Sequence, residues 1–147
     1  MSKLKLEVIK YSKKLNITNL SVLRSGNISV RAKENGVEGF YITPSGMKYS
    51  SLKTKDIVFV SLKGIFDKKK KKPSSEWRFH QDIYVNKKEA KAIVHAHSTC
   101  ATAVSSHQKN IPAFHYMVAV AGGEDLKCTK YATFGTKQLS KNIIKAL

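Results

Sequence analysis

The stretch that decides the fold of this chain is Pro73-Ser74-Ser75-Glu76-Trp77-Arg78-Phe79-His80. A proline followed by serines is typical of a helix start, because proline suits the first turn and serine hydroxyls cap free N–H groups. Trp77, His80 and Tyr84 then repeat at i, i+3 and i+7, so their side chains share one side of a helix. We therefore predict a helix over residues 75–86.

The segments before this helix predict one further helix and three strands. Apolar residues recur at helical spacing from Leu4 to Leu15, which predicts a helix over residues 3–15. The predicted strands cover residues 27–31, 39–43 and 56–62. Glu34-Asn35-Gly36 supplies a turn between the first two strands, which are therefore expected to form a hairpin.

The segments after it predict a strand and two helices. Residues 92–97 form a short apolar strand, and a helix of small residues follows over 98–107. Leu139, Ile143 and Leu147 mark an amphipathic last helix. Because strands and helices alternate irregularly, we expect an α/β fold with a mixed sheet covered by helices. The last helix stops without a glycine cap, and we expect the chain to lack a C-terminal portion.

The composition limits the class of protein. The 147 residues suit one domain, and 41% hydrophobic with 25% charged residues indicate a globular protein rather than a disordered or membrane one. We expect no membrane partner and, in the absence of a signal peptide pattern, a cytoplasmic location. Cys100 and Cys128 show no CxxC spacing, so we interpret both as small buried residues.

The net charge of +17 leaves a polyanionic partner open. The lysines are spread along the chain without interleaved aromatic residues, so a solvated surface is the simpler interpretation and nucleic acid is disfavoured. The run from Lys68 to Lys72 is read first as an exposed loop, with a polyanion-binding patch as the alternative.

His95 and His97 are candidate metal ligands. Side chains alternate along a strand, so both imidazoles point to the same face and can bind one zinc ion. Two histidines alone do not make a site, and a structural histidine pair is the competing interpretation.

Three short polar segments are candidates for binding a phosphate. Ser74 and Ser75 at a helix start offer hydroxyls and free N–H groups, although ordinary capping also explains them. The Gly26-Asn27 and Ser45-Gly46 turns let a backbone approach an anion, although each is also a common turn. A phosphate held there would bring its carbons to Glu76 as a base, whose alternative role is a favourable charge in the first turn.

These segments together resemble the class II aldolase and adducin family. The resemblance runs from about residue 4 to the end, in order, and is most specific over residues 73–80. It implies a three-layer α/β/α fold with a mostly antiparallel sheet. The motifs that carry it are Ser25-Gly26-Asn27-Ile28-Ser29, Thr43-Pro44-Ser45-Gly46, the residues 73–80 quoted above, His95-Ala96-His97, Ile111-Pro112-Ala113-Phe114-His115-Tyr116-Met117 and Tyr131-Ala132-Thr133-Phe134-Gly135-Thr136.

The resemblance also implies a reaction and a role for each candidate residue. The reaction is zinc-dependent, reversible aldol cleavage of a ketose 1-phosphate of the L-fuculose 1-phosphate type to dihydroxyacetone phosphate and an aldehyde. Glu76 is the implied acid/base and a metal contact, with Tyr116 as proton donor at a subunit boundary of a homotetramer and Phe134 on the aldehyde side. The implied zinc ligands are His95 and His97, and the implied phosphate contacts are Gly26, Asn27, Ser45, Gly46, Ser74 and Ser75.

Two features depart from the family pattern. The third zinc-ligating histidine of the family lies further downstream than this sequence extends, and His80, His107 and His115 are not in its position. The usual glycine and threonine before the Gly-Asn turn are replaced by Leu23 and Arg24. Dehydration of methylthioribulose 1-phosphate, 4-epimerisation of a pentulose phosphate and a non-catalytic adducin-like binding module remain as alternatives.

Overall fold

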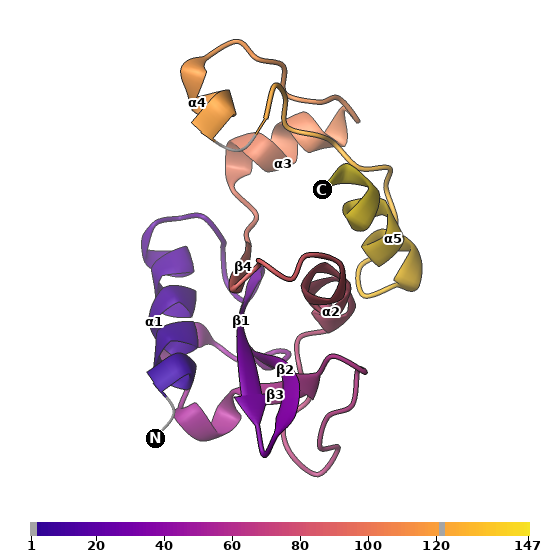
Figure 1. Ribbon diagram of the computed structural model, residues 1–147. Helices are drawn as coiled ribbons and strands as arrows, with labels where there is room; N and C mark the ends of the chain where they lie inside the picture. The colour runs from indigo at the N-terminus through magenta and orange to yellow at the C-terminus, as the bar shows by residue number, and fades with distance from the viewer. Residues whose placement is uncertain (1–2, 121–122) are drawn as a thin grey trace.

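The computed structural model describes residues 3–120 and 123–147, and its centre is a four-stranded sheet in the order β3-β2-β1-β4 (Figure 1). All three ladders that join these strands are antiparallel. The predicted strands are therefore present, with shifted ends. The strands are β1 (Asn27–Glu34), β2 (Val37–Ile42), β3 (Val58–Ser61) and β4 (Ala92–His95).

Helices cover both faces of the sheet, so the fold is the expected three-layer α/β/α arrangement. Figure 1 shows α1 on one side of the sheet and α2 on the other, with α5 packed along α2. No helix in the described ranges has the length and apolar character needed to cross a membrane. The helices are α1 (Lys3–Ile17), the short 3-10 helices η1 (Tyr49–Ser51) and η2 (Thr54–Asp56), α2 (Trp77–Asn86), α3 (Thr99–Ser106), α4 (Tyr116–Val120) and α5 (Lys137–Ala146).

The alternation of side chains along β2 divides the core in two. Phe40 and Ile42 lie on the α2 side, where they pack with Tyr84, whereas Tyr41 lies on the α1 side with Val8. Burying an apolar side chain of this size stabilises a fold by about 1.5–3 kcal/mol. The sheet is held between α1 and α2 by these two clusters.

The β1–β2 hairpin closes through the predicted turn. Glu34 pairs with Val37, which leaves Asn35 and Gly36 as the loop, and both have positive φ values of 49° and 80°. A two-residue loop of this kind needs positive φ at both positions, and Asn-Gly is the favoured pair. The hairpin prediction is confirmed.

Helix α2 starts later than predicted because Pro73 and Ser74 pair with the strand end at Thr43 and Pro44, and Ser75 and Glu76 form a turn. Pro73 bridges to Pro44, and the N–H of Ser74 donates to the carbonyl of Thr43 over 2.9 Å. The helix therefore begins at Trp77 with Glu76 as its N-cap residue. Ser74 and Ser75 precede the helix rather than forming its first turn.

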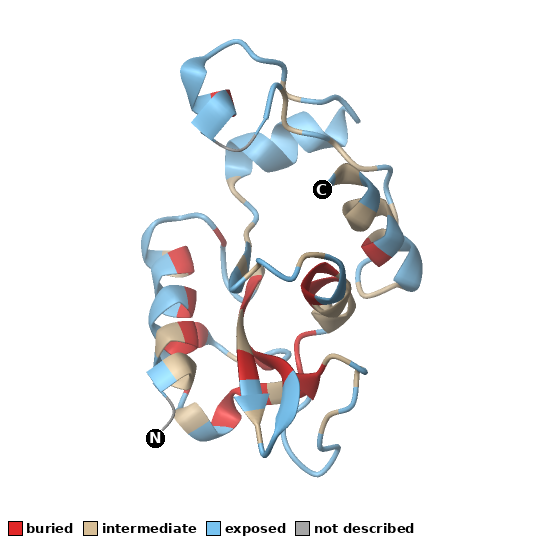
Figure 2. Ribbon diagram, viewed as in Figure 1, coloured by how far each residue is buried: buried red, intermediate tan, exposed pale blue. Residues whose placement is uncertain are grey.

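The interpretation of the cysteines as buried residues is wrong. Cys100 is exposed and Cys128 is half-buried. Helix α3, which carries Cys100, has no buried residue within the described ranges, and Figure 2 shows it exposed along its length. A small side chain is buried only where another element covers its helix face.

Candidate active site

The site forms between the polar face of β1 and the N-terminal half of α2. On β1, Ile28 and Ala32 pack against the α1 side. By alternation, Asn27, Ser29 and Arg31 face α2, and each makes a hydrogen bond or close polar contact with α2 or the residues at its ends. A polar layer thus lies inside an otherwise apolar interface.

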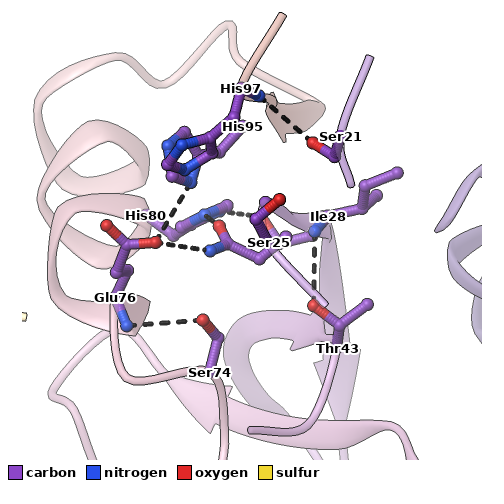
Figure 3. A network of polar contacts seen from close by, with 12 residues as sticks. Ser21, Ser25, Ile28, Thr43, Ser74, Glu76, His80, His95 and His97 are labelled. Carbon is purple, nitrogen blue, oxygen red and sulfur yellow. Dashed lines mark hydrogen bonds and ion pairs between the residues drawn. The ribbon is translucent and has the colours of Figure 1, made fainter. Parts of the chain in front are cut away.

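The structure brings Glu76, His95 and His97 together. A carboxylate oxygen and one nitrogen of each imidazole lie within 4.8 Å of one another. The two imidazole centroids are 4.7 Å apart. Figure 3 shows both histidines above the Glu76 carboxylate, with Ser74 on its other side. Strand β4 ends at His95, two residues earlier than predicted. The imidazole of His97 nevertheless lies beside that of His95, as the sequence predicted.

The loop after α1 holds the two histidines in place. The N–H of His97 lies 2.9 Å from the carbonyl of Leu20 and 3.1 Å from Oγ of the buried Ser21. Gly26 packs so closely that a Cβ atom there would lie 2.6 Å from the carbonyl oxygen of His95, and its φ is 78°. Glycine is therefore required at this contact.

The donor set fits a divalent cation of the zinc type. Nδ1 of His95 is buried, lies 3.1 Å from Oε2 of Glu76 and has no hydrogen-bond partner in the described part of the chain. A buried nitrogen without such a partner is costly unless it binds something else. Two imidazoles and a carboxylate are common zinc ligands, with bond lengths of about 2.0–2.2 Å.

The surroundings of Glu76 favour its charged form. Burial alone would raise its pKa, but the contact with His95, the hydrogen bond from Asn27 and the nearby His97 together lower the pKa below its usual value. Nδ2 of Asn27 donates to Oε2 of Glu76 over 2.9 Å. Burial and the nearby His95 lower the pKa of His97, partly offset by Glu76. At neutral pH the site therefore holds an ionised Glu76 carboxylate beside a neutral His97.

The candidate phosphate residues lie on three segments that are joined by hydrogen bonds to backbone carbonyl groups. The hydroxyl of Tyr49 donates to the carbonyl of Gly26 over 2.6 Å, and Arg24 donates to the carbonyl of Gly46 over 2.8 Å. Thr43 accepts from the N–H of Ser74, as described above. These contacts join the segments that carry Gly26 and Asn27, Ser45 and Gly46, and Ser74 and Ser75, and of these residues Asn27 and Ser74 hydrogen-bond to Glu76.

The lysine run ends beside these segments. The N–H of Ser45 donates to the carbonyl of Lys72 over 3.0 Å. A cavity of about 400 Å³ is lined by Ser45, Ser75, Lys68 and Lys72 together with Phe66, Pro73 and Trp77. Two serines and two lysines thus border this cavity, while Phe66, Pro73 and Trp77 make most of its lining apolar.

Tyr116 and Phe134, which the family resemblance also assigns to the site, are both exposed. Tyr116 is 73% exposed on α4, and Figure 1 shows α4 at the far end of the molecule from α2 and β4. Within one chain, Tyr116 is therefore not part of the Glu76 cluster. Phe134 is also exposed, but its neighbour Gly135 packs against the backbone of Ser75.

Sequence reasoning missed the buried polar partners of the site. The sequence predicts His80 only as a member of a helical stripe and outside the position of the third ligand, yet it is fully buried and contacts Asn27 and Ser29. A signal was present. Asn27 and Ser29 alternate on one strand face, and Glu76, His80 and Tyr84 recur every four residues on one helix face.

A family model described as the Class II Aldolase and Adducin N-terminal domain matches residues 6–147. A 5-methylthioribulose-1-phosphate/5-deoxyribulose-1-phosphate aldolase of Rhodospirillum rubrum is 46% identical over 123 residues, which cover 84% of this chain and 53% of that protein. The L-fuculose phosphate aldolase of Escherichia coli strain K12 is also 46% identical over 123 residues, covering 84% and 55%. The chain spans about half the length of these curated relatives.

The fold has a counterpart among solved structures. A structure of L-fuculose 1-phosphate aldolase superposes with a TM-score of 0.90 at 40% identity, covering 99% of this chain and 68% of that one. The similarity therefore extends over the described elements from α1 to α5.

Proposed function

Because this chain belongs to the class II aldolase and adducin family, we propose that it performs the reversible aldol cleavage of a ketose 1-phosphate to dihydroxyacetone phosphate and an aldehyde. The observation that carries the proposal is that Glu76, His95 and His97 lie together in space. Glu76 also follows Ser74 and Ser75 directly in the sequence. A base, a metal-binding pair and an anion-binding segment are thereby adjacent, as this reaction requires.

The metal is proposed to be zinc, held by His95, His97 and, before substrate binds, Glu76. Zinc supplies Lewis-acid stabilisation for the negative charge that develops on the substrate oxygens. A catalytic zinc site usually has three protein ligands and an open position, which matches this set when Glu76 is counted. The phosphate is proposed to bind Asn27, Ser74 and Ser75 with the Gly26 and Ser45-Gly46 backbones.

The proposed proton transfers involve two residues. In the condensation direction, the Glu76 carboxylate takes a proton from the carbon of dihydroxyacetone phosphate that attacks the aldehyde. Tyr116 gives a proton to the aldehyde oxygen as the new C–C bond forms. In cleavage the same two protons return, from Glu76 to carbon and from the substrate hydroxyl to Tyr116. The lowered pKa of Glu76 keeps its side chain ionised at neutral pH, which is the form that can accept a proton.

The test combines metal analysis with product detection. Purified chain is loaded with zinc and given L-fuculose 1-phosphate or 5-methylthioribulose 1-phosphate, the substrates in the two relatives' names. Release of dihydroxyacetone phosphate is then measured with a coupled dehydrogenase. This product separates cleavage from dehydration and epimerisation, and the ratio of the two rates identifies the preferred substrate. No release from either substrate would refute the proposed cleavage.

His95→Ala is the variant that tests the metal site. We expect it to lose both bound zinc and product release, because a zinc ligand is removed. His107→Ala is the matched control, since His107 is exposed at the end of α3 and should retain both. Full zinc content in His95→Ala would rule out His95 as a ligand.

We also propose that the working form is a cytoplasmic homotetramer in which Tyr116 of one chain completes the site of its neighbour. Its 73% exposure and its distance from Glu76 within one chain support this arrangement. Glu76→Gln and Tyr116→Phe should each be inactive alone. Refolded together in equal amounts, they should regain about a quarter of the parent activity, because random mixing leaves that share of sites intact. No recovery would contradict shared sites.

A further inference from the structure

We propose that His80 is a positioning residue that fixes the side-chain amide of Asn27, and through it the carboxylate of Glu76, by means of a hydrogen-bond chain with one fixed direction. These hydrogen bonds can exist whether or not the protein catalyses the proposed reaction. Their effect on turnover rests on the function proposed above.

The contacts form an unbroken series across the β1–α2 interface. The hydroxyl of Tyr84 lies 2.9 Å from Oγ of Ser29, which lies 2.7 Å from Nδ1 of His80. Nε2 of His80 contacts Oδ1 of Asn27, and Nδ2 of Asn27 donates to Oε2 of Glu76 over 2.9 Å. Figure 3 shows His80 behind Glu76 within this network.

The direction of the series follows from its last member. An ionised carboxylate only accepts, so Asn27 must present its NH₂ group to Glu76 and its oxygen to His80. Nε2 of His80 must then carry the proton, and Nδ1 must accept from the hydroxyl of Ser29. Ser29 in turn accepts from Tyr84. Each donor thereby has an acceptor, and His80 is held as the Nε2–H tautomer.

The neutral state of His80 is enforced by its surroundings. The residue is fully buried, with its ring stacked on Phe79 at a centroid distance of 4.5 Å and a second stack on Phe40. Burial, with a smaller effect from the nearby His95, lowers the pKa of His80 to about 3. The carboxylate, amide and hydroxyl contacts therefore do not reorganise across the neutral pH range.

The positioning effect works by excluding one orientation of Asn27. An amide that is free to rotate by half a turn would point its oxygen at the Glu76 carboxylate, and two acceptors in contact repel each other. The donor on Nε2 of His80 prevents that rotation. Glu76 thus keeps a donor partner and stays at the position it occupies beside His95.

The first test is the tautomer of His80, measured on the chain itself by long-range ¹H–¹⁵N NMR of the histidine rings. The signals that disappear in His80→Gln identify His80. We expect a single neutral Nε2–H pattern that persists to about pH 5, where exposed histidines are protonated. An Nδ1–H pattern, or an average of both tautomers, would overturn the proposal whether or not the chain is an aldolase.

The second test is rescue by a conservative variant. His80→Gln retains a donor directed at Asn27, whereas His80→Leu has none. We expect kcat/KM to fall by about tenfold or more in His80→Leu and by at most about threefold in His80→Gln, with equal zinc content in both. Equal losses in the two variants would refute a positioning role. If His80→Leu does not fold, a loss above tenfold in His80→Gln refutes it.

These measurements distinguish two kinds of failure. If the parent chain releases no dihydroxyacetone phosphate, the proposed function fails, and the NMR pattern still decides whether the chain of hydrogen bonds exists. If the parent is active and the tautomer is wrong, only the role of His80 fails.

Discussion

The interface between β1 and α2 and the segment of residues 99–134 are built in opposite ways. In the first, polar side chains such as Ser29 and His80 are fully buried and partnered. In the described part of the second, residues 99–120 and 123–134, many large apolar side chains are exposed, among them Phe114 and Tyr131, although Val118 is buried. Figure 2 shows α3 of this region exposed along its length. One region hides polar groups and the other exposes apolar ones, which reverses the usual arrangement in each.

The difference shows which site residues are positioned by contacts within one chain and which depend on contacts between chains. Glu76, His95 and His97 are held by contacts made within one chain, so their arrangement is a property of the fold. Tyr116 is not held in this way, and its proposed role depends on an assembly. Changes in the first region should therefore affect the chemistry of the site directly, whereas single changes in the second should leave the folded chain intact.

The largest expected effect is that of Glu76→Gln. The amide cannot accept the proton, so we expect turnover to fall by about 10²–10⁴-fold. Zinc should stay bound, because His95 and His97 are unchanged and the amide still offers an oxygen in place of the carboxylate. The measurements are the rate of dihydroxyacetone phosphate release and the zinc content. Glu38→Gln, an exposed change on the hairpin, is the control and should behave as the parent does. Undiminished turnover in Glu76→Gln would rule out the proposed base.

The elements of the fold were predictable because periodicity is a local property. The alternation around Phe40 and the helical spacing from Leu4 to Leu15 predicted strands and helices that the structure contains. The ends of elements were less predictable, since contacts between distant segments set them. Helix α2 begins at Trp77 because Thr43 holds Ser74, and β4 ends at His95 because Leu20 holds His97.

The site was predictable only in part. The meeting of His95, His97 and Glu76 followed from strand alternation and the family resemblance. The role of His80 did not, because Asn27 and His80 are 53 residues apart and their contact depends on how β1 faces α2. The exposure of Cys100 also could not be inferred, since burial depends on what covers α3.

The next largest effect is expected on the free energy of unfolding, and it is tested by comparing two phenylalanines, one from each region. Phe40 is 0% exposed and Phe114 is 73% exposed. We expect Phe40→Ala to lower the free energy of unfolding by about 3–5 kcal/mol, because it leaves a cavity between β2 and α2. Phe114→Ala should change it by no more than about 0.5 kcal/mol. Urea unfolding of the two variants measures both values, and a similar loss in each would show that residues 99–134 are packed more firmly than the structure indicates.

The smallest expected effect is a loss of stability in acid that depends on His80. Burial lowers the pKa of His80 to about 3, below the value of 6.5 in an unfolded chain. As the pH falls from 6.5 towards 3, the unfolded state gains a proton that the folded state does not, so stability decreases. At pH 5 this residue alone should lower the free energy of unfolding by about 2 kcal/mol relative to pH 7. In His80→Gln that part of the acid dependence should be absent, whereas His107→Gln, at the exposed C-cap of α3, should keep it. Parallel curves of unfolding free energy against pH for the parent and His80→Gln, between pH 7 and pH 5, would mean that His80 is protonated in the folded state. The polar layer between β1 and α2 would then be accessible to solvent, as the exposed side chains of the second region are.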